Sequence, residues 1–283
     1  MIKRIDEVPA ILTCFAYREE YFAEMEGMLA TIREHHPDWP IVVGRGPVPG
    51  FDMPTLEVES PSGKCLWTLP VSLNIEGTID DYYRITMIKG WWVAQVWHKF
   101  GDLVAGHRKR VVWTDADNRF NGPLDIEFER EAEVVAGLWA HDSEDSNQDT
   151  ICSGLLFFQG AMQGVVENII DRWSNKCLGY IQNLPPLTKE RFDGDQEALH
   201  EILQSYPDSS GDFVLIKLDM NKYARCPNAG DILGPRGLVD HWYISGKMES
   251  PEYHHLNWPP PEEFRRHAEV GTPIPNINWE PED

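Results

Sequence analysis

Two aspartates one residue apart follow a short apolar run near the middle of the chain. Asp115 and Asp117 come directly after Val111, Val112 and Trp113. In an extended segment, residues i and i+2 point to the same side, so the two carboxylates can converge on one object. Oxygen ligation of this kind suits Mg²⁺, Mn²⁺ or Ca²⁺. The alternative interpretation is a polar turn at the end of a strand, where Asp and Asn are common.

The apolar run before the pair predicts a buried strand. Residues 110–114 are rich in β-formers and show no alternation that would expose one face, which is typical of a parallel or mixed sheet. In open α/β sheets, ligands bind just beyond the carboxyl ends of the strands. We therefore expect Asp115 and Asp117 to lie in a ligand crevice.

The rest of the chain alternates between strand and helix patterns. Further strands are expected at 9–15, 41–43, 134–138, 153–158, 213–218 and 237–244, and helices at 19–35, 82–100, 161–176 and 195–206. Residues 44–79 are expected to be irregular, with one weak strand at 56–58. This order predicts an α/β fold with a mixed, mostly parallel sheet flanked by helices. We expect a single domain over residues 1–250 and a proline-rich, acidic extension over 251–283.

Charged residues near the expected helices have simple interpretations. Asp80 and Asp81 offer N-caps for the helix at 82–100. Arg84 and Lys89 fall off the apolar stripe of that helix, so each is taken alone as a solvated surface cation. Three tryptophans of the same helix are expected to pack in the core: Trp91, Trp92 and Trp97.

The composition excludes several classes of protein. The 283 residues contain no 18-residue apolar run and no N-terminal hydrophobic stretch, so we expect a cytoplasmic protein that does not insert into a membrane. Five cysteines without C-x-x-C spacing argue against a disulfide framework or a structural zinc site. A net charge of −21 makes nucleic-acid binding unfavourable, although Arg108–Arg110 leave a local basic cleft open.

Five short motifs follow one another in a specific order. Tyr83-Arg84-Ile85 opens a helix, Asp115-Ala116-Asp117 ends a strand, Ser153-Gly154 opens a strand, Asp195-Gln196 starts a helix, and His241 lies in the last strand. In this order they resemble the GT-A-fold glycosyltransferases, nucleotide-sugar-dependent enzymes with a D-x-D metal motif. The closest resemblance is to the glycogenin-like and bacterial lipopolysaccharide galactosyltransferase-like group. It spans residues 8–248.

The resemblance implies a metal-dependent sugar transfer from a nucleoside diphosphate sugar, by family expectation a UDP-sugar. Asp115, Asp117 and His241 would hold Mn²⁺ or Mg²⁺ on the diphosphate. Arg84 and Lys247 would neutralise phosphate or sugar oxygens. The remaining residues of the nucleotide-sugar site would be Ala16, Tyr17, Thr114, Ala116, Ser153 and Gly154, with Asp115 contacting both donor and metal.

The resemblance also implies the residues at the reacting face. Asp195 and Gln196 would reach sugar hydroxyls or the reacting carbon. If the reaction inverts the anomeric carbon, Asp195 or Asp193 is the candidate base. If it retains the configuration, Gln196 or a backbone carbonyl lies near that carbon instead. The late motif departs from the family's H-x-x-G-x-x-K spacing. Here the glycine, Gly246, lies farther from His241 than in the family, and Lys247 follows that glycine directly. The stereochemical outcome and the acceptor therefore stay open.

Three other interpretations compete with this one. A haloacid-dehalogenase-like phosphatase also has D-x-D at a strand end, but it requires Thr or Val where this chain has Arg119. A nucleotidyltransferase uses paired carboxylates and Mg²⁺ on an α/β sheet. A non-catalytic nucleotide-sugar-binding protein with a decayed transferase fold is the third. His241 and the Ser153-Gly154 strand favour sugar transfer.

Overall fold

The computed structural model describes residues 2–4, 9–17, 19–46, 55–60, 63–68, 79–104, 106–129, 131–139, 151–183, 194–206, 213–223 and 238–241. Within these ranges only the backbone is described for residues 17, 19–23, 45–46, 55–60, 63–68, 79–85, 181–183, 221 and 240–241.

The described residues form twelve strands and five α-helices. The strands are β1 (Ile2–Arg4), β2 (Ile11–Tyr17), β3 (Ile41–Gly46), β4 (Thr55–Ser60), β5 (Gly63–Thr68), β6 (Lys109–Thr114), β7 (Asn118–Phe120), β8 (Glu127–Glu129), β9 (Val134–Trp139), β10 (Ile151–Gly160), β11 (Val214–Leu218) and β12 (Val239–His241). The helices are α1 (Glu19–His35), α2 (Ile79–Phe100), α3 (Val165–Asn183), α4 (Asp195–Gln204) and α5 (Met220–Tyr223), with a 3-10 turn, η2, at Gly101–Leu103.

Eight strands form the central sheet in the order β11-β9-β10-β6-β2-β3-β4-β5. β11 runs parallel to β9, and β2 runs parallel to both β6 and β3. β10 and β4 run antiparallel to each of their neighbours. Apart from β10 and β4, the strands of this described sheet therefore run in one direction. The predicted mixed, mostly parallel sheet is confirmed.

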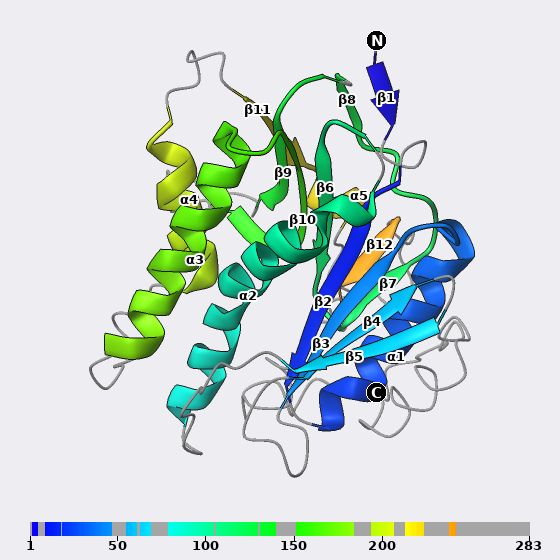
Figure 1. The fold of residues 1–283 in the computed structure, drawn as a ribbon, viewed down its shortest axis with the longest axis vertical. Helices are drawn as coiled ribbons and strands as arrows, with labels where there is room; N and C mark the ends of the chain where they lie inside the picture. The colour runs from blue at the N-terminus through cyan, green and yellow to red at the C-terminus, as the bar shows by residue number, and fades with distance from the viewer. Residues whose placement is uncertain are drawn as a thin grey trace, which may run out of the picture.

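Helices cover both faces of the sheet (Figure 1). α2, α3 and α4 pack on one face, where Val111 and Trp113 of β6 join their apolar cluster. α1 packs on the other face, where Val112 of β6 joins Met25 and Met28. Every residue of β6 is buried. The unbroken apolar run predicted for this strand thus follows from burial on both faces.

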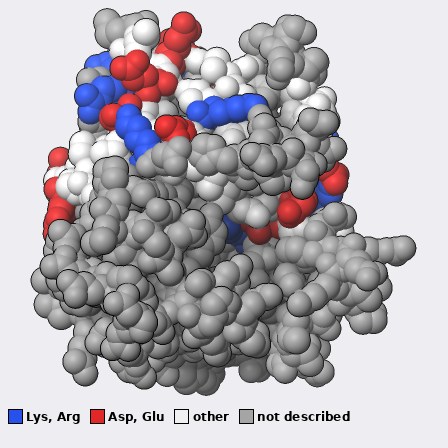
Figure 2. Space-filling model, turned by 180° about the vertical axis from the view of Figure 1, so that it is seen from behind, with Lys and Arg blue, Asp and Glu red and all other residues white. Residues whose placement is uncertain are grey.

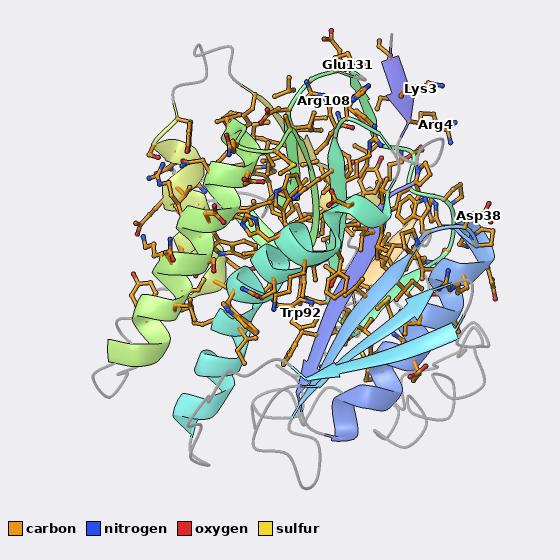
Figure 3. All side chains as sticks on the ribbon, in the orientation of Figure 1. Lys3, Arg4, Asp38, Trp92, Arg108 and Glu131 are labelled. Atoms are coloured by element: carbon orange, nitrogen blue, oxygen red, sulfur yellow. The ribbon has the colours of Figure 1, made fainter. Side chains whose placement is uncertain are left out.

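Helix α2 is buried on two sides because it lies between the sheet and helices α3 and α4. On the sheet side, Trp92 is fully buried and its Nε1 donates a hydrogen bond to Oγ1 of Thr13 at 2.7 Å (Figure 3). On the other side, a Cβ at Gly90 would lie 2.9 Å from Sγ of Cys177 in α3, so the glycine permits close packing. The predicted core packing of Trp91, Trp92 and Trp97 is confirmed.

A short two-stranded ribbon follows the carboxyl end of β6. β7 pairs antiparallel with β12, with Asn118 opposite His241. The loop before β8 is tied to α5, since Asp125 accepts hydrogen bonds from Lys222 at 2.8 Å and from Tyr223 at 2.6 Å. A second short ribbon pairs β1 with β8. The first ribbon places His241 beside the turn that carries the two aspartates.

The predicted strand at 56–58 is confirmed as part of β4, but the prediction that the rest of 44–79 is irregular was wrong where the structure describes it. β3 continues to Gly46, and β4 and β5 form an antiparallel pair at the edge of the sheet. The segment 55–60 reads T-L-E-V-E-S, and its apolar-polar alternation is the period of a strand. The strands β1, β7 and β8 were not predicted, because three residues carry too little pattern to show a period.

The predicted helix boundaries also need correction. α2 begins at Ile79, so Asp80 and Asp81 lie in its first turn, where carboxylates stabilise the positive end of the helix. α3 begins at Val165 because a turn with positive φ at Gln163 precedes it. The N-cap of α4 is Gly194, whose N–H donates to Glu197 at 2.8 Å, and the helix begins at Asp195 and ends at Gln204.

Several predictions concern residues outside the described ranges. They include the extension at 251–283, so the domain boundary at 250 stays a prediction. Within the described ranges, no helix combines the length and the apolar character needed to cross a bilayer.

Candidate functional site

The D-A-D segment and the Ser153-Gly154 segment meet at one edge of the sheet. β10 runs antiparallel beside β6, with Leu155 opposite Thr114. Just beyond this pair, the backbone N–H of Asp115 donates to the carbonyl of Gly154 at 3.0 Å. The end of β6 and the start of β10 are therefore joined by hydrogen bonds at the residues that the sequence singled out.

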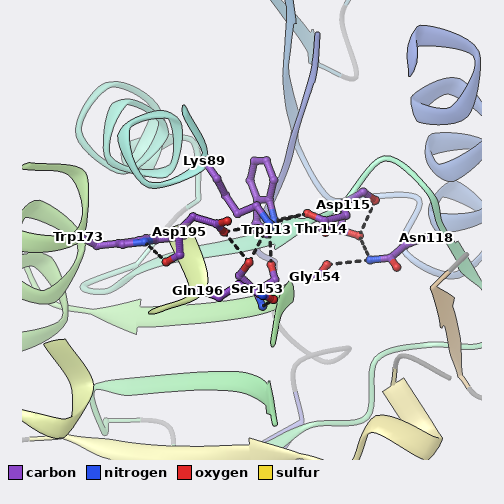
Figure 4. Close-up of polar contacts among 10 residues, drawn as sticks. All are labelled: Lys89, Trp113, Thr114, Asp115, Asn118, Ser153, Gly154, Trp173, Asp195 and Gln196. Carbon is purple, nitrogen blue, oxygen red and sulfur yellow. Dashed lines mark hydrogen bonds and ion pairs between the residues drawn. The ribbon is translucent and has the colours of Figure 1, made fainter. Parts of the chain in front are cut away.

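Lys89 of α2 lies at the centre of the polar contacts (Figure 4). Its Nζ is 3.0 Å from Oδ1 of Asp115 and 3.2 Å from Oδ2 of Asp195. It also donates to Oγ of Ser153 at 2.8 Å and lies 5.3 Å from the ring centroid of Trp113. One ammonium group thus joins two carboxylates that belong to different elements.

The environment of Lys89 keeps it protonated. Burial alone disfavours the ammonium form, but the adjacent carboxylates of Asp115 and Asp195 outweigh that effect, and the pKa of Lys89 is raised above its ordinary value. The prediction that Lys89 is a solvated surface cation was wrong, since the residue is 9% exposed. The physical reason is that α2 is buried on two sides, so a position off the apolar stripe does not face water.

The start of α4 supplies the second carboxylate of the cluster. Asp195 is 5% exposed, and its Oδ2 accepts a hydrogen bond from Oγ of Ser153 at 2.5 Å. Its backbone carbonyl accepts a hydrogen bond from Nε1 of Trp173 at 2.8 Å, which fixes the first turn of the helix. The next residue, Gln196, accepts from the backbone N–H of Ser153 at 3.1 Å. Ser153 therefore fixes both Asp195 and Gln196.

The two aspartates of the D-A-D segment lie in a turn and not in an extended segment. The N–H of Asn118 donates to the carbonyl of Asp115 at 3.2 Å, which closes the turn. The two residues of this segment that do lie on the same side are Trp113 and Asp115. Nε1 of Trp113 donates a hydrogen bond to Oδ1 of Asp115 at 2.9 Å. The prediction of an extended Asp115–Asp117 segment was wrong, because β6 ends at Thr114.

Both carboxylates of the turn nevertheless lie close enough to Cys14 to raise the pKa of its thiol. Cys14 of β2 is fully buried, and its pKa is raised by burial and then by the negative charges of Asp115 and Asp117. Asp117 is itself 9% exposed. The pair therefore concentrates negative charge at the end of the two central strands β2 and β6.

Two observations fit a divalent cation at this turn. The Oδ1 of Asn118 is buried without a hydrogen-bond partner among the described residues, whereas its Nδ2 donates to Thr114 at 2.7 Å and to the carbonyl of Gly154 at 2.8 Å. Among the described side chains, the three carboxylates of Asp115, Asp117 and Asp195 are accompanied by one ammonium group, that of Lys89, so a divalent charge would balance these four groups. No three metal-ligating side chains converge among those described, a set that does not include the side chain of His241.

The other predicted residues are placed as follows. Ala16 is buried at the end of β2. Thr114 is fully buried, and its hydroxyl is used within the turn. The carbonyl of Ala116 accepts from Arg119 at 3.3 Å. Tyr17, Arg84 and His241 are described by backbone alone, and Asp193 and Lys247 lie outside the described residues.

The basic run Arg108–Arg110 lies at the opposite end of β6. Lys109 and Arg110 are buried; Lys109 donates to the carbonyl of Trp97 at 3.1 Å and Arg110 donates to Gln159 at 2.7 Å. Arg108 lies 3.7 Å from Glu131 (Figure 3). In Figure 2, acidic and basic side chains are interspersed over the described part of the surface shown. The run is therefore not a basic cleft beside the D-A-D turn.

Comparison with known proteins identifies the fold. A glycosyltransferase involved in the glycosylation of the major capsid of PBCV-1 aligns over 93% of this chain and 100% of its own, with a TM-score of 0.51 and 13% identity. This chain has a GT-A-like fold. No protein-family model and no curated protein sequence matches the chain.

Two further structures align less closely with the GT-A-like fold of this chain. The galactosyltransferase LgtC covers 92% of this chain and 95% of its own, with a TM-score of 0.45 and 10% identity. GlyE of Streptococcus pneumoniae TIGR4 covers 92% of this chain and 62% of its own, with a TM-score of 0.42 and 10% identity. The fold assignment rests on the first structure, and it confirms the predicted fold class.

Sequence reasoning missed Lys89 and Trp113 as members of the site. A signal for Trp113 was present, because it precedes Asp115 by two residues in a predicted strand and so shares its side. No local signal identified Lys89, whose partners Asp115 and Asp195 are distant in sequence. The spacing of residues in a helix predicts which face is apolar, but it does not predict which charged residue is covered by another helix.

Proposed function

We propose that this protein transfers a sugar from a nucleoside diphosphate sugar, by resemblance a UDP-sugar, to an acceptor that the site does not identify. The observation that carries the proposal is the cluster in which Lys89 joins Asp115 of the D-A-D turn to Asp195 of α4, at the carboxyl end of β6 in a GT-A-like sheet. Position supports it as well, since ligands of open α/β sheets bind beyond the carboxyl ends of the strands.

Asp115, Asp117 and His241 are proposed to hold Mn²⁺ or Mg²⁺. Such an ion would supply Lewis-acid stabilisation of the departing diphosphate. Asp117 is buried in the turn, and the register of β7 and β12 sets the backbone of His241 opposite Asn118. A mixed carboxylate and imidazole set suits Mn²⁺, while Mg²⁺ prefers oxygen ligands.

Lys89 is proposed to hold Asp115 and Asp195 at a fixed separation. Its ammonium contacts both carboxylates and the hydroxyl of Ser153. A carboxylate that is already held in place can accept a hydrogen bond from a hydroxyl group of the sugar donor without moving first. This favours binding of the sugar donor in one orientation. Arg84 and Lys247 are proposed to contact phosphate or sugar oxygens of the sugar donor. The last residues of β2 are proposed to contact its nucleobase, and the first residues of β10 its sugar.

Asp195 and Gln196 are proposed to orient the donor sugar. Oδ2 of Asp195 accepts hydrogen bonds from Lys89 and Ser153, which fix the direction of this carboxylate. Oε1 of Gln196 accepts from Ser153, which leaves its amide N–H₂ to donate to the sugar. This arrangement favours the retaining alternative, in which Gln196 lies near the anomeric carbon.

The test is a screen of nucleoside diphosphate sugars with Mn²⁺, with Mg²⁺ and with EDTA, followed by analysis of the products. We expect metal-dependent release of nucleoside diphosphate and free sugar, through slow transfer to water. An Asp115→Ala/Asp117→Ala variant should lose this activity. Release of a nucleoside monophosphate would indicate a nucleotidyltransferase instead. Metal-dependent binding without any turnover on donor and acceptor panels would indicate a binding protein.

A further inference from the structure

Arg119 contacts the backbone on both sides of Asp117. Its Nη1 donates to the carbonyl of Asn118 at 2.8 Å and to the carbonyl of Ala116 at 3.3 Å. These two carbonyls belong to the residues that flank Asp117. The guanidinium group therefore holds the peptide unit that precedes Asp117 and the one that follows Asn118, and so constrains the stretch of backbone that carries this carboxylate.

Glu24 of α1 holds that guanidinium in place. Nη2 of Arg119 lies 2.7 Å from Oε2 of Glu24, and the two side chains are 12% and 4% exposed. A guanidinium group has a planar array of donors, so one nitrogen can bind the carboxylate while the other binds the two carbonyls. The ion pair thus connects α1 directly to the turn.

α1 supports the adjoining strand at a second point. The backbone N–H of Phe120 in β7 donates to Oγ1 of Thr31 at 3.1 Å. β7 in turn pairs with β12, where Arg119 stands opposite Asp240 and Asn118 opposite His241. α1 therefore contacts the turn with Asp117 directly and supports the strand with His241 through β7.

We propose that Glu24 and Arg119 are a positioning pair that sets the geometry of the metal-binding turn. This inference rests on the proposed function, in which Asp115, Asp117 and His241 bind a divalent ion. Neither residue of the pair touches the ion or the donor. Their effect is to hold Asp117 and the neighbouring ribbon in the arrangement that binds the ion. Stability alone gives little reason for the pair, since buried ion pairs are commonly no better than apolar residues of similar volume.

Replacement of this buried ion pair by apolar residues provides the test. A Glu24→Leu/Arg119→Met double variant replaces the pair with apolar side chains of similar volume. It avoids the uncompensated buried charge that either single truncation would leave. We expect this variant to remain folded, with its unfolding midpoint shifted to a lower denaturant concentration because two carbonyls lose their donor. Its affinity for Mn²⁺ should fall about 10–100-fold, as is typical when a residue that supports a metal ligand is removed.

Mn²⁺ binding is measured on the full chain by electron paramagnetic resonance of the free ion, alone and with UDP, so that the readout does not depend on turnover. The matched control is Arg110→Met/Gln159→Leu, which removes a buried arginine and its partner at the opposite end of β6. The control should bind Mn²⁺ as the wild type does. Arg119→Lys is a second variant, which keeps the ion pair with Glu24 but cannot reach both carbonyls, and it should fall between wild type and double variant.

The outcomes separate the inference from the function on which it rests. A wild-type protein that binds no Mn²⁺, with or without UDP, overturns the metal site and the positioning role together. A wild type that binds Mn²⁺ and a folded double variant with the same affinity overturn the positioning role alone. If the double variant does not fold, unchanged Mn²⁺ affinity in Arg119→Lys overturns it.

Discussion

The Nζ atom of Lys89 lies 3.0 Å from Oδ1 of Asp115, so a buried helix cation is joined directly to the first carboxylate of the D-A-D turn. The same ammonium lies 3.2 Å from Asp195, the first residue of α4. Lys89 thereby connects the two parts of the proposed site, the turn for the ion and the helix for the sugar. Its removal should affect both stability and activity.

We expect Lys89→Met to lower the free energy of unfolding by about 3–5 kcal/mol, because it leaves the buried Asp195 and the partly buried Asp115 without their shared cation. Donor turnover should fall with it, since the two carboxylates then repel each other. Lys89→Arg should recover part of both losses. The matched control is Lys109→Met, which removes another buried lysine at the opposite end of β6, whose Nζ has a carbonyl partner rather than carboxylates. Equal effects of the two methionine substitutions on donor turnover would contradict the role of Lys89.

The raised pKa of Lys89 predicts a pH dependence at the alkaline end. Below the ordinary lysine value of 10.5, both the folded and the unfolded chain carry the proton, so the stabilising contribution is fully present. Above it, the unfolded chain loses the proton first, and the contribution is lost as the pH rises towards the folded value. Denaturant unfolding across this range should therefore show a steeper loss for wild type than for Lys89→Arg, which stays charged. Parallel curves would argue against the buried pairing.

Asn118 should matter for stability through its two donated hydrogen bonds. Asn118→Ala leaves the hydroxyl of Thr114 and the carbonyl of Gly154 without this donor, and we expect a loss of about 1–3 kcal/mol in the free energy of unfolding. The control is Asn168→Ala on the exposed side of α3, where a change within about 0.5 kcal/mol is expected. Chemical denaturation of both variants gives the comparison. A loss at position 118 no larger than at 168 would show that the turn does not depend on these bonds.

The stereochemistry of the transferred sugar is a further prediction. Lys89 and Ser153 hold the carboxylate of Asp195, which is proposed to orient the donor sugar, and Gln196 is proposed to lie near the anomeric carbon. We therefore expect a product with the donor's anomeric configuration. Proton NMR of the sugar released early in donor hydrolysis, before mutarotation, distinguishes the two anomers. An inverted product would assign the base role to Asp195 or to Asp193.

Much of the fold could be predicted from local pattern. The apolar run of β6 and the stripe of α1 are set by burial of adjacent residues, and both were placed correctly. β4 was expected only as a weak strand at 56–58, and its partner β5 was missed because residues 63–68 show no regular alternation of apolar and polar side chains. The order of motifs suggested which carboxylates matter, but it could not show that Asp115 lies in a turn, since a strand end is set by its partner strands.

The contacts that the sequence could not predict are those between distant elements. Lys89 meets Asp115 and Asp195 only because α2, β6 and α4 converge at one edge of the sheet. Glu24 meets Arg119 only because α1 packs against β7. Neither spacing nor residue type specifies such pairs, since each depends on how complete elements pack.

The central claim is that the D-A-D turn binds a nucleoside diphosphate through a divalent ion. It is tested most directly by isothermal titration of UDP into the wild type and into Asp115→Ala/Asp117→Ala, each with Mn²⁺ and with EDTA. We predict that the wild type binds UDP only when Mn²⁺ is present and that the double variant, while still folded, does not bind it under either condition. Binding of UDP to the wild type with equal affinity in EDTA, or undiminished Mn²⁺-dependent binding by the variant, would contradict the claim.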